Sequence, residues 1–406
     1  MTLDSARELD RADKLAPYRE RFHRPQDKLY LCGHSLGLQP KSAAAKVLEE
    51  LEDWKTMGVR GHAEARRPWA PYHELLAEQG ARLMGAEPGE IVHMNTLTVN
   101  VHLLMVSFYR PTPERHKILI EDHAFPSDHY AVESQIRFHG FDPAESLLIV
   151  GLDDDVHDVI DREGDSLALV WLGGVNYYSG QVFDMRAITE HSHARGAVVG
   201  FDLAHGAGNI PLALHDWDVD CAAWCTYKYL NGGPGSVAGA FVHERHANWK
   251  DLPRFTGWWG HDKATRFEMG PNFNPIPGAE GWQLSNPPIL SLAPVLASLE
   301  IFDEVGMDVL RAKSEKLTRY FEELIDRELA GKVEVVTPRE PARRGCQFSL
   351  RVLSENGRAV FDSISARGVV CDWREPDVIR AAAAPLYNGF EDLYRFVETL
   401  KEAIGS

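Results

Sequence analysis

Two residues at the ends of neighbouring β-rich runs, Asp202 and Lys228, carry side chains that together could perform carbonyl chemistry. Asp202 ends the run AVVGFD (197–202), and Lys228 directly follows CAAWCTY (221–227). An aldehyde cofactor such as pyridoxal phosphate bonds to a lysine amine and needs a carboxylate beside its pyridinium nitrogen, so that its ring can accept electrons. Asp202 alone is typical of a helix N-cap, and Lys228 alone of a surface lysine. The pair favours a pyridoxal-phosphate site.

A phosphate group would find donors in the segment MNTLTVNVHLLMVSF (94–108), which is typical of a turn that enters an amphipathic helix. Thr96 or Thr98 lies near the N-terminus of that helix, where free amides and the helix dipole favour an anion. Ordinary helix capping explains one threonine equally well. The segment therefore indicates a phosphate site only in combination with the lysine and aspartate.

A planar ring could be held by the segment AFPSDHYA (124–131), which follows the run HKILIED (116–122). Phe125 could stack on the ring, and the side chains of Ser127 and Asp128 could hydrogen-bond to it. A turn built around a proline and an aspartate explains the same residues equally well. Both interpretations stay open on local grounds.

Arg380 lies in DVIRAAAAPLYN, at the end of an apolar run with few polar neighbours. A guanidinium in such surroundings is suited to bidentate binding of a carboxylate, for instance that of an amino-acid substrate. A structural ion pair explains Arg380 nearly as well. His205 follows Asp202 by three positions and would lie near the same strand end.

These side chains need a sheet that brings several strand ends to one edge. The middle of the chain alternates β-rich runs with helical segments, which predicts an α/β fold with a mostly parallel sheet covered on both faces. Open sheets of this kind bind ligands at the carboxyl ends of their strands. The expected strands are 116–122, 166–174, 197–202, 221–227 and 236–244, with a helix at 187–196.

From about Ile289 the pattern changes to a long amphipathic helix followed by a smaller α+β domain. The Pro-rich stretch PNFNPIPG (271–278) is a plausible loop between the two parts. The expected elements after the long helix are the strands KVEVV, CQFSLRV and GVVCDW, a helix near 358–367 and the final helix FEDLYRFVETLKEAI.

Length and composition fit a globular protein of two or more domains, because the chain has 406 residues, 44% of them hydrophobic and 25% charged. A net charge of −17 argues against a nucleic-acid partner or an anionic membrane. The first residues lack an apolar signal core, and no apolar run approaches the ~20 residues that span a bilayer. We expect a cytoplasmic protein.

The five cysteines form an odd, scattered set without CxxC spacing. Disulfides and a structural zinc site are therefore not expected, we assign no metal, and a reducing compartment fits. Cys221 and Cys225 fall inside an expected strand and Cys346 begins another, which is typical of buried structural thiols.

In combination, several blocks of this chain resemble the kynureninase family, whose members are pyridoxal-phosphate enzymes with the aspartate aminotransferase fold (fold type I). The similarity extends from YLCGHSLGLQPK (30–41) to APLYNGFEDLYRF (384–396). The blocks between them are TLTVNVHLLM, FPSDHYA, GVNYYSGQ, GFDLAHGAGN, YKYLNGGPGS, GWWGH and SNPPI.

The resemblance implies a large pyridoxal-phosphate-binding domain with a seven-stranded, mostly parallel sheet (61–290). A connecting helix and a small C-terminal α+β domain would follow (291–406), and an N-terminal segment (1–60) would pack on the small domain. It also implies a homodimer with its active site at the subunit interface, so that some site residues come from the second subunit. The partner molecule would be a small amino-acid substrate.

Site roles also follow from the resemblance. Lys228 would carry the cofactor, Asp202 would pair with its ring nitrogen, and Phe125 would stack on its ring. The cofactor's phosphate would be held by Leu97, Thr98, Tyr227 and Trp258. Ser127, Asp128 and His205 would lie around its ring. His62 and Asn286, the latter also near the cofactor, would approach the aromatic end of the substrate, and Arg380 its α-carboxylate.

The reaction implied is hydrolysis of the Cβ–Cγ bond of L-kynurenine, or of its 3-hydroxy form, to an anthranilate and L-alanine in tryptophan degradation. Lys228, Asp202 and Tyr227 are the expected catalytic residues, with Tyr227 transferring a proton late in the reaction. The choice between the two substrates, and between catabolism and NAD biosynthesis, stays open.

Two alternatives deserve a test. The first is another fold type I enzyme, an aminotransferase or a cysteine desulfurase, although a desulfurase needs an exposed, mobile thiol. The second is a scaffold protein that has lost catalysis, which the presence of Lys228 and Asp202 disfavours. The chain departs from relatives at His34, where asparagine is common, and at Gly173, where some carry serine.

Overall fold

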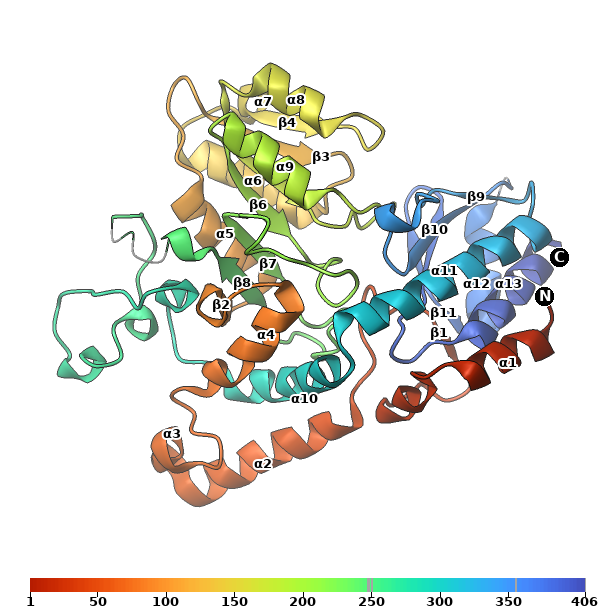
Figure 1. Cartoon of the computed structure of the whole chain (residues 1–406), viewed down its shortest axis with the longest axis horizontal. Coiled ribbons are helices and arrows are strands. Elements are labelled where there is room, and N and C mark those ends of the chain that lie inside the picture. The colour runs from red at the N-terminus through yellow and green to blue at the C-terminus, as the bar shows by residue number, and fades with distance from the viewer. Residues whose placement is uncertain (247–248, 250, 355, 406) are drawn as a thin grey trace.

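The computed structural model describes residues 1–246, 249, 251–354 and 356–405. Two main sheets lie at opposite ends of an elongated molecule, and helices α10 (Ile289–Val305) and α11 (Met307–Glu328) run between them (Figure 1). Both chain termini lie beside the smaller sheet. Among the described residues, no helix combines the length and apolarity needed to cross a bilayer.

The larger sheet has seven strands in the order β2-β8-β7-β6-β5-β3-β4. The pairs that β8 makes with β2 and β7 are antiparallel, and the pairs among β7, β6, β5, β3 and β4 are parallel. The expectation of a mostly parallel sheet is confirmed. The strands are β2 (Ile91–His93), β3 (Lys117–Glu121), β4 (Leu147–Val150), β5 (Leu167–Gly173), β6 (Val198–Asp202), β7 (Cys221–Trp224) and β8 (Gly239–Val242).

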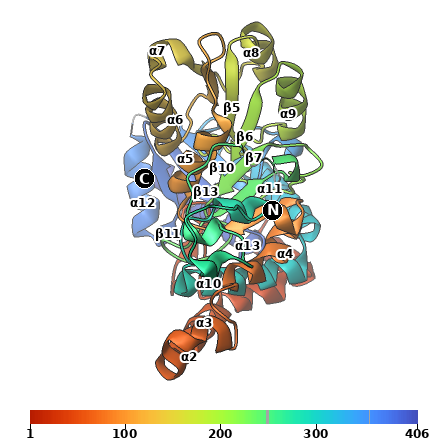
Figure 2. The same ribbon diagram turned by 90° about the vertical axis from the view of Figure 1, so that its left-hand side faces the viewer.

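Both faces of this sheet are covered by helices because successive side chains of its strands point to opposite sides. In β5, Leu169 and Trp171 belong to one apolar core, whereas Val170 and Leu172 belong to the other. Figure 2 shows the strands between the two helical layers. One layer contains α5 (Leu97–Phe108), α6 (Pro126–Phe138) and α7 (Pro143–Ser146); the other contains α4 (Ala77–Met84), α8 (Val156–Glu163) and α9 (Met185–Ala194).

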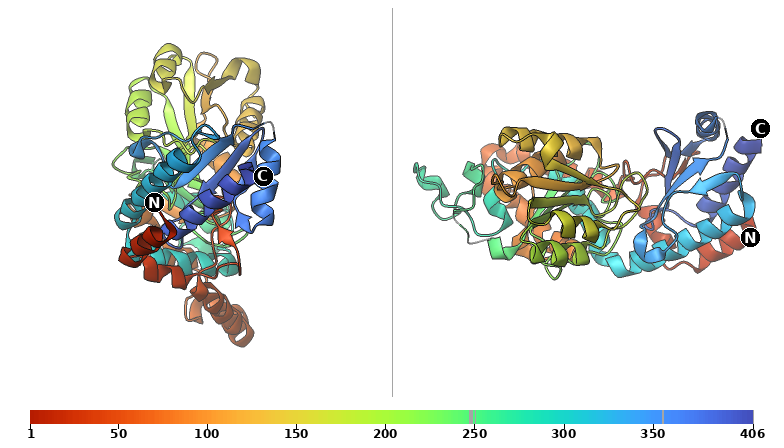
Figure 3. Two further views of the ribbon diagram at one scale, coloured as in Figure 1. Left: turned by 90° about the vertical axis from the view of Figure 1, so that its right-hand side faces the viewer. Right: turned by 90° about the horizontal axis from the view of Figure 1, so that it is seen from above.

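The smaller sheet is antiparallel, with the strand order β12-β13-β10-β9. Helices α11, α12, α13 and α1 share its apolar core. The view from above shows helices of this part of the chain beside the strands of the smaller sheet (Figure 3). A parallel pair, β1 with β11, ties the N-terminal segment to this part of the chain. The elements are α1 (Leu3–Ala12), β1 (Leu29–Tyr30), β9 (Val333–Val335), β10 (Gln347–Val352), α12 (Gly357–Ala366), β11 (Val369–Val370), β12 (Asp372–Arg374), β13 (Val378–Ala382) and α13 (Phe390–Gly405).

Two elements that we expected to be continuous are each divided into two in the structure. The single long helix after Ile289 is broken at Gly306, whose φ of 81° ends α10 and starts α11 in a new direction. The single strand GVVCDW is also divided, because β11 pairs with β1 whereas β12 pairs with β13. Three short strands, β1, β2 and β4, had no expected counterpart.

Helix α2 (Lys41–Met57) packs along α10, and the short helix α3 (Gly61–Glu64) follows it. Together α2 and α3 project from the body of the molecule (Figure 2). Several large apolar side chains on them are exposed, including Val59, in the turn between the two helices, at 81% and Trp54 at 61%. Such side chains on a projecting arm are typical of a surface that another chain covers.

Candidate active site

A cavity of about 320 Å³ lies at the carboxyl ends of the parallel strands. Glu121, Gly173 and Asp202 are the last residues of β3, β5 and β6, and Lys228 follows β7 by four positions. The fold therefore brings four strand ends to one edge of the sheet, where open α/β sheets bind their ligands. The lining residues are Thr96, Leu97, Thr98, Glu121, Phe125, Ser127, Asp128, Gly173, Val175, Tyr177, Asp202, Ala204, His205, Tyr227 and Lys228.

Lys228 lies between two aromatic rings in this cavity. Its Nζ is 5.7 Å from the ring centroid of Phe125 and 6.0 Å from that of Tyr227. The turn that carries it is held by Gly37, whose amide donates to the carbonyl of Tyr227 at 2.8 Å. A Cβ at Gly37 would come within 2.3 Å of the Lys228 carbonyl, so this close backbone approach requires glycine.

Three buried carboxyl groups face the lysine: Glu121, Asp128 and Asp202. Burial raises the pKa of all three, to about 7 for Glu121. The hydrogen bond between the two aspartates raises the pKa of Asp128 further and opposes the rise at Asp202, as does the charge of Lys228. Asp202 is therefore the member of the pair that ionises first, and its Oδ1 accepts from the amide of Ala204 at 2.6 Å.

The N-terminus of α5 forms one wall of the cavity. Thr96 is the N-cap, and its side chain makes no capping hydrogen bond to the helix. The chain turns into this helix through Asn95, which has a φ of 51°. The amides of the first turn, at Leu97 and Thr98, have no intrahelical acceptor, and both residues line the cavity.

This arrangement fits pyridoxal phosphate. An amine, a buried carboxylate and a partly exposed aromatic ring meet in one cavity, and a helix N-terminus offers donors for a phosphate. The buried carboxyls outnumber the single ammonium beside them, so a protonated ring nitrogen would supply charge that the site lacks. Leu97, Thr98, Phe125, Ser127, Asp128, Asp202, His205, Tyr227 and Lys228 all lie in this cavity.

His205 and Arg380 are buried beside the cavity in different ways. His205 lines it, and burial together with the charge of Lys228 lowers its pKa. Arg380 lies outside the lining, under Tyr177, and donates to the carbonyl of that residue at 2.6 Å. Its other nitrogens bind Asp372 at 2.7 and 2.5 Å. The ion pair considered from the sequence is thus present in this structure.

His34 belongs to the same group of buried side chains as Arg380 and Asp372. His34 is fully buried, and its Nε2 is 3.1 Å from the Asp372 carboxylate. Burial and the charge of Arg380 lower its pKa to about 4. A neutral imidazole therefore lies next to the carboxylate that holds Arg380.

Three expected site residues lie outside the cavity lining. Trp258 is 42% exposed and donates its Nε1–H to the carbonyl of Arg266 at 3.0 Å. His62 is exposed on α3, with Nδ1 3.0 Å from the Val59 carbonyl oxygen. Asn286 is exposed in the loop before α10. The structure of one chain does not bring these side chains to Lys228.

Glu121 is a cavity residue that the sequence reasoning missed. Its two carboxylate oxygens lie 3.2 and 3.1 Å from the amide nitrogen of Gly173. A Cβ at Gly173 would be 2.7 Å from Glu121 Oε1, so the carboxylate occupies the space that a side chain at this position would need. The signal was available, because the β-rich run HKILIED (116–122) ends in two acidic residues, Glu121 and Asp122.

The five cysteines are all buried, and none forms a disulfide. Burial raises the pKa of Cys225, and raises that of Cys32 to about 11 and that of Cys346 to about 12. A desulfurase needs a reactive thiolate that can reach the substrate. None of these thiols has that exposure.

The chain is similar over nearly its whole length to proteins named kynureninase. It is 58% identical to the one from Koribacter versatilis, over 98% of this chain and 96% of that protein. It is 57% identical to that from Myxococcus xanthus over the same shares, and 52% identical to that from Flavobacterium psychrophilum over 99% of this chain and 98% of that one. The family model of the kynureninase C-terminal domain matches residues 310–400.

Solved structures with the same fold include the cystine C–S lyase C-DES, with glycine covalently linked to the PLP cofactor. Its TM-score is 0.79 at 19% identity, over 95% of this chain and 99% of that chain. The cysteine desulfurase from Thermococcus onnurineus has a TM-score of 0.78 at 15% identity, over 96% and 98%. At these identities the likeness describes the fold.

The expected fold, cofactor and family are therefore confirmed. The sequence matches extend across both sheets, and the cavity holds the lysine, carboxylate and helix N-terminus that such a cofactor requires. This chain belongs to the kynureninase family, the pyridoxal-phosphate-dependent hydrolases of a carbon–carbon bond in ketonic substrates.

Proposed function

We propose that this chain hydrolyses L-kynurenine, its 3-hydroxy form, or both, to the corresponding anthranilate and L-alanine. The observation that carries the proposal is the cavity in which Lys228, Asp202 and Phe125 meet at the carboxyl ends of the parallel strands. The high identity to kynureninases over the whole chain supports the same reaction.

Asp202 would hold the ring nitrogen of pyridoxal phosphate, Phe125 would stack on the ring, and the amides of Leu97 and Thr98 would hold the phosphate. The hydroxyl of Tyr227 would add a donor to the phosphate, and Ser127 would hydrogen-bond at the ring. When bound, the cofactor supplies an aldehyde for covalent attachment and a ring that takes up electrons from the substrate. The protein's part is to position these groups and keep water out.

Lys228 would remove the proton from the substrate's Cα, because its amine is the basic group at the centre of the cavity. Tyr227 would donate a proton to the β-carbon after the Cβ–Cγ bond breaks. This role is supported by its position in the cavity, with its ring 6.0 Å from Lys228 Nζ. Burial raises the pKa of its phenol, so the hydroxyl stays protonated and able to donate at neutral pH.

Arg380 would bind the substrate's α-carboxylate. Its guanidinium is buried below Tyr177, which lines the cavity, and it is already balanced by Asp372. A carboxylate would therefore have to share the guanidinium with Asp372 or take one of its contacts. Arginine suits this because its planar fork offers several donors at once.

We propose a homodimer in which His62, Asn286 and Trp258 act in the cavity of the neighbouring subunit. All three are exposed and lie away from Lys228 in their own chain. They are accompanied by exposed apolar side chains, including Val59, Trp54 and Phe267. Association through the projecting arm would cover these side chains and complete the substrate site.

The domain limits of 1–60, 61–290 and 291–406 remain our proposal for the division of the chain. We also propose a cytoplasmic location, which is supported by five cysteines that are free and buried.

The direct test is an assay of the purified protein with L-kynurenine and with 3-hydroxy-L-kynurenine. Stoichiometric alanine and anthranilate, or 3-hydroxyanthranilate, would support the proposal. Formation of a keto acid, or of sulfide or persulfide from cysteine, would instead indicate an aminotransferase or a desulfurase. The ratio of kcat/KM values decides between the two kynurenines.

A further inference from the structure

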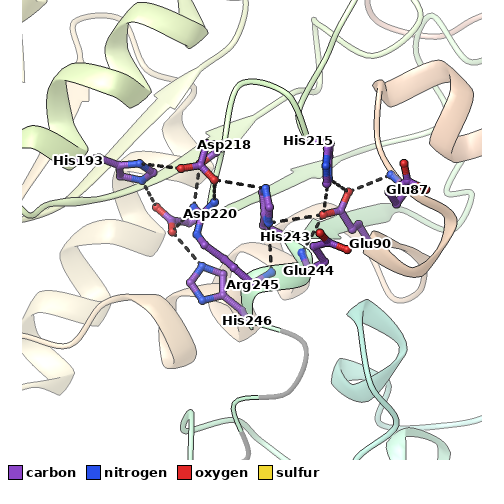
Figure 4. Close-up of polar contacts among 10 residues, drawn as sticks. All are labelled: Glu87, Glu90, His193, His215, Asp218, Asp220, His243, Glu244, Arg245 and His246. Carbon is purple, nitrogen blue, oxygen red and sulfur yellow. Dashed lines mark hydrogen bonds and ion pairs between the residues drawn. The ribbon is translucent and has the colours of Figure 1, made fainter.

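Figure 4 shows a cluster of histidines and carboxylates. It lies at the amino-terminal edge of the large sheet, whereas the cavity that holds Lys228 lies at the carboxyl ends of the parallel strands. Glu90 ends the short 3-10 helix η4 (Pro88–Glu90), just before β2. His215 lies in the connection between β6 and β7, and His243 follows the last residue of β8. Three segments that are distant in sequence thus converge on one point.

The donor atoms of Glu90, His215 and His243 lie close enough together to share one cation. His215 Nδ1 is 3.0 Å from Glu90 Oε1, and His243 Nδ1 is 3.6 Å from the same oxygen. One ligand atom from each residue lies within 4.8 Å of the others. Donor atoms around a tetrahedral zinc ion are about 3.3 Å apart, so small side-chain movements would suffice.

His243 has the orientation of a metal ligand. Its Nδ1 accepts a hydrogen bond of 3.2 Å from the amide of Arg245, which means that this nitrogen carries a lone pair rather than a proton. The proton is then on Nε2, which faces Asp218 Oδ1 at 3.4 Å. A carboxylate behind the second nitrogen fixes the ring and makes the first nitrogen a better ligand.

The charge around this point favours a cation. Among the ten residues drawn in Figure 4, five are acidic and one, Arg245, is an arginine. Arg245 is held by Asp218 and Asp220, so its charge is balanced by those two carboxylates. Among the described residues, Glu90 forms ion pairs only with His215 and His243. Its carboxylate also accepts from the amides of Glu244 and Glu87 at 2.7 and 2.9 Å, but in the described part of the chain no lysine or arginine pairs with it.

In two other groups of possible ligands, the carboxylates already pair with a lysine or an arginine. In the group of Cys32, His34 and Asp372, the carboxylate binds Arg380. In the group of His73, Glu74 and Glu280, both carboxylates bind Lys263. A metal ion at either place would have to displace an existing cation.

Solvent reaches the Glu90 cluster through a cavity of about 400 Å³, whose lining includes Glu90, His215, Glu87 and Glu244. The far wall is Gly278, which approaches the carbonyl of Gly89 so closely that a Cβ would be 2.3 Å from it. An ion could therefore enter from solvent and retain water or a surface carboxylate as a further ligand.

We propose that Glu90, His215 and His243 form a binding site for a divalent transition-metal cation such as Zn²⁺. Two imidazoles and a carboxylate select this class over Mg²⁺ or Ca²⁺, which prefer oxygen ligands. The ion displaces the proton of His215 Nδ1 into solvent, and it replaces the hydrogen bond between His215 and Glu90 and the one from the Arg245 amide to His243. It joins η4, the β6–β7 connection and the end of β8, and it stabilises this edge of the sheet without contacting the cofactor cavity.

The test is titration of the cofactor-loaded protein with ZnCl₂, followed by isothermal calorimetry and thermal unfolding. We expect about one ion per chain and a rise in Tm with zinc concentration, because a ligand that binds the folded state alone stabilises it. His215→Gln and His243→Gln should each weaken binding at least about tenfold, and Asp218→Asn about tenfold. His215 is more exposed than His243, so its replacement disturbs the fold less. The His215 variant therefore still tests the site if the His243 variant does not fold.

His191→Gln is the matched control. His191 is exposed to a similar degree as His215 and pairs with the carboxylate of Asp161 at 2.9 Å. It should leave zinc affinity unchanged. Absence of saturable zinc binding would overturn the proposal, as would equal affinity in the wild type and in His215→Gln, which would place the ion elsewhere.

Discussion

The carboxylate of Glu121 accepts a hydrogen bond from the amide of Gly173 at 3.1 Å and fills the space next to that glycine. The two residues end neighbouring parallel strands, β3 and β5, at the edge where the cofactor would bind. Glu121 thus adds a third buried carboxyl to the pair Asp128 and Asp202. The negative potential of the cavity depends on whether Glu121 is ionised.

Glu121→Gln should change how stability depends on pH in the cofactor-free protein. Burial raises the pKa of Glu121 from its ordinary 4.5 to about 7, so between these values the folded protein keeps a proton that the unfolded chain releases. Stability therefore falls as pH rises through this window. The glutamine variant should be more stable than the wild type by about 1–3 kcal/mol at pH 8, with the difference shrinking toward pH 5.

Urea unfolding of both proteins between pH 5 and pH 8 measures this difference. The glutamine oxygen can still accept from the Gly173 amide, so the comparison isolates the charge. A difference that stays constant across the whole pH range would mean that Glu121 does not titrate there.

Asp202→Asn should weaken cofactor binding and lower kcat by about two orders of magnitude or more. The amide has nearly the same shape but cannot balance a protonated ring nitrogen, and the electron demand of the reaction depends on that charge. Cofactor affinity by fluorescence titration and kcat with saturating cofactor separate the two effects. Near-normal kcat in the fully loaded variant would remove Asp202 from the role proposed for it.

Tyr227→Phe should retain the cofactor but turn over about 10²–10⁴-fold more slowly, because the variant lacks the hydroxyl proposed as a proton donor. Tyr229→Phe is the control on the other side of Lys228: Tyr229 is buried outside the cavity lining and should tolerate the change. Single-turnover kinetics on both variants are the measurement. Full activity in Tyr227→Phe would assign the proton transfer to another group.

Val59→Asp should dissociate the proposed dimer and reduce activity, because a charge placed on the projecting arm would be buried against the second subunit. Phe138→Asp is the control, since Phe138 is similarly exposed, at 75%, but lies at the end of α6. Light scattering after gel filtration gives the mass of each variant. A monomeric wild type with full activity would contradict the proposed dimer.

A second experiment asks whether the subunits share residues. The Lys228→Ala and His62→Ala variants should each have little activity when assayed separately. A mixture of the two that exchanges subunits should recover up to about a quarter of wild-type activity. Recovery is expected because one hybrid site contains neither substitution. No recovery after verified exchange would place His62 in the cavity of its own chain.

The sequence predicted the large sheet well because its strands are short buried runs that end in chemically distinctive residues. Asp202 ended such a run, and its strand end lies beside Lys228 in the structure. The continuity of elements was less predictable. The helical sequence pattern continues through Gly306 without indicating a break, yet the positive φ of this residue separates α10 from α11.

Local pattern was least informative for side chains placed by long loops. His62, Trp258 and Asn286 lie on an arm and a loop whose positions depend on tertiary contacts, and in one chain they are exposed. Glu121 could have been found by applying to β3 the same strand-end rule that selected Asp202. The sequence could not identify Asp372 as the ion-pair partner of Arg380, because Asp372 lies on a neighbouring strand of the antiparallel sheet.

The central claim is that Lys228 bonds to the cofactor and performs the proton chemistry. The most direct measurement is the absorbance spectrum of purified Lys228→Ala in the presence of pyridoxal phosphate, recorded together with its kynurenine turnover. We predict loss of the visible band of lysine-bound cofactor and loss of alanine formation. An unchanged spectrum with turnover intact would contradict this account of the site.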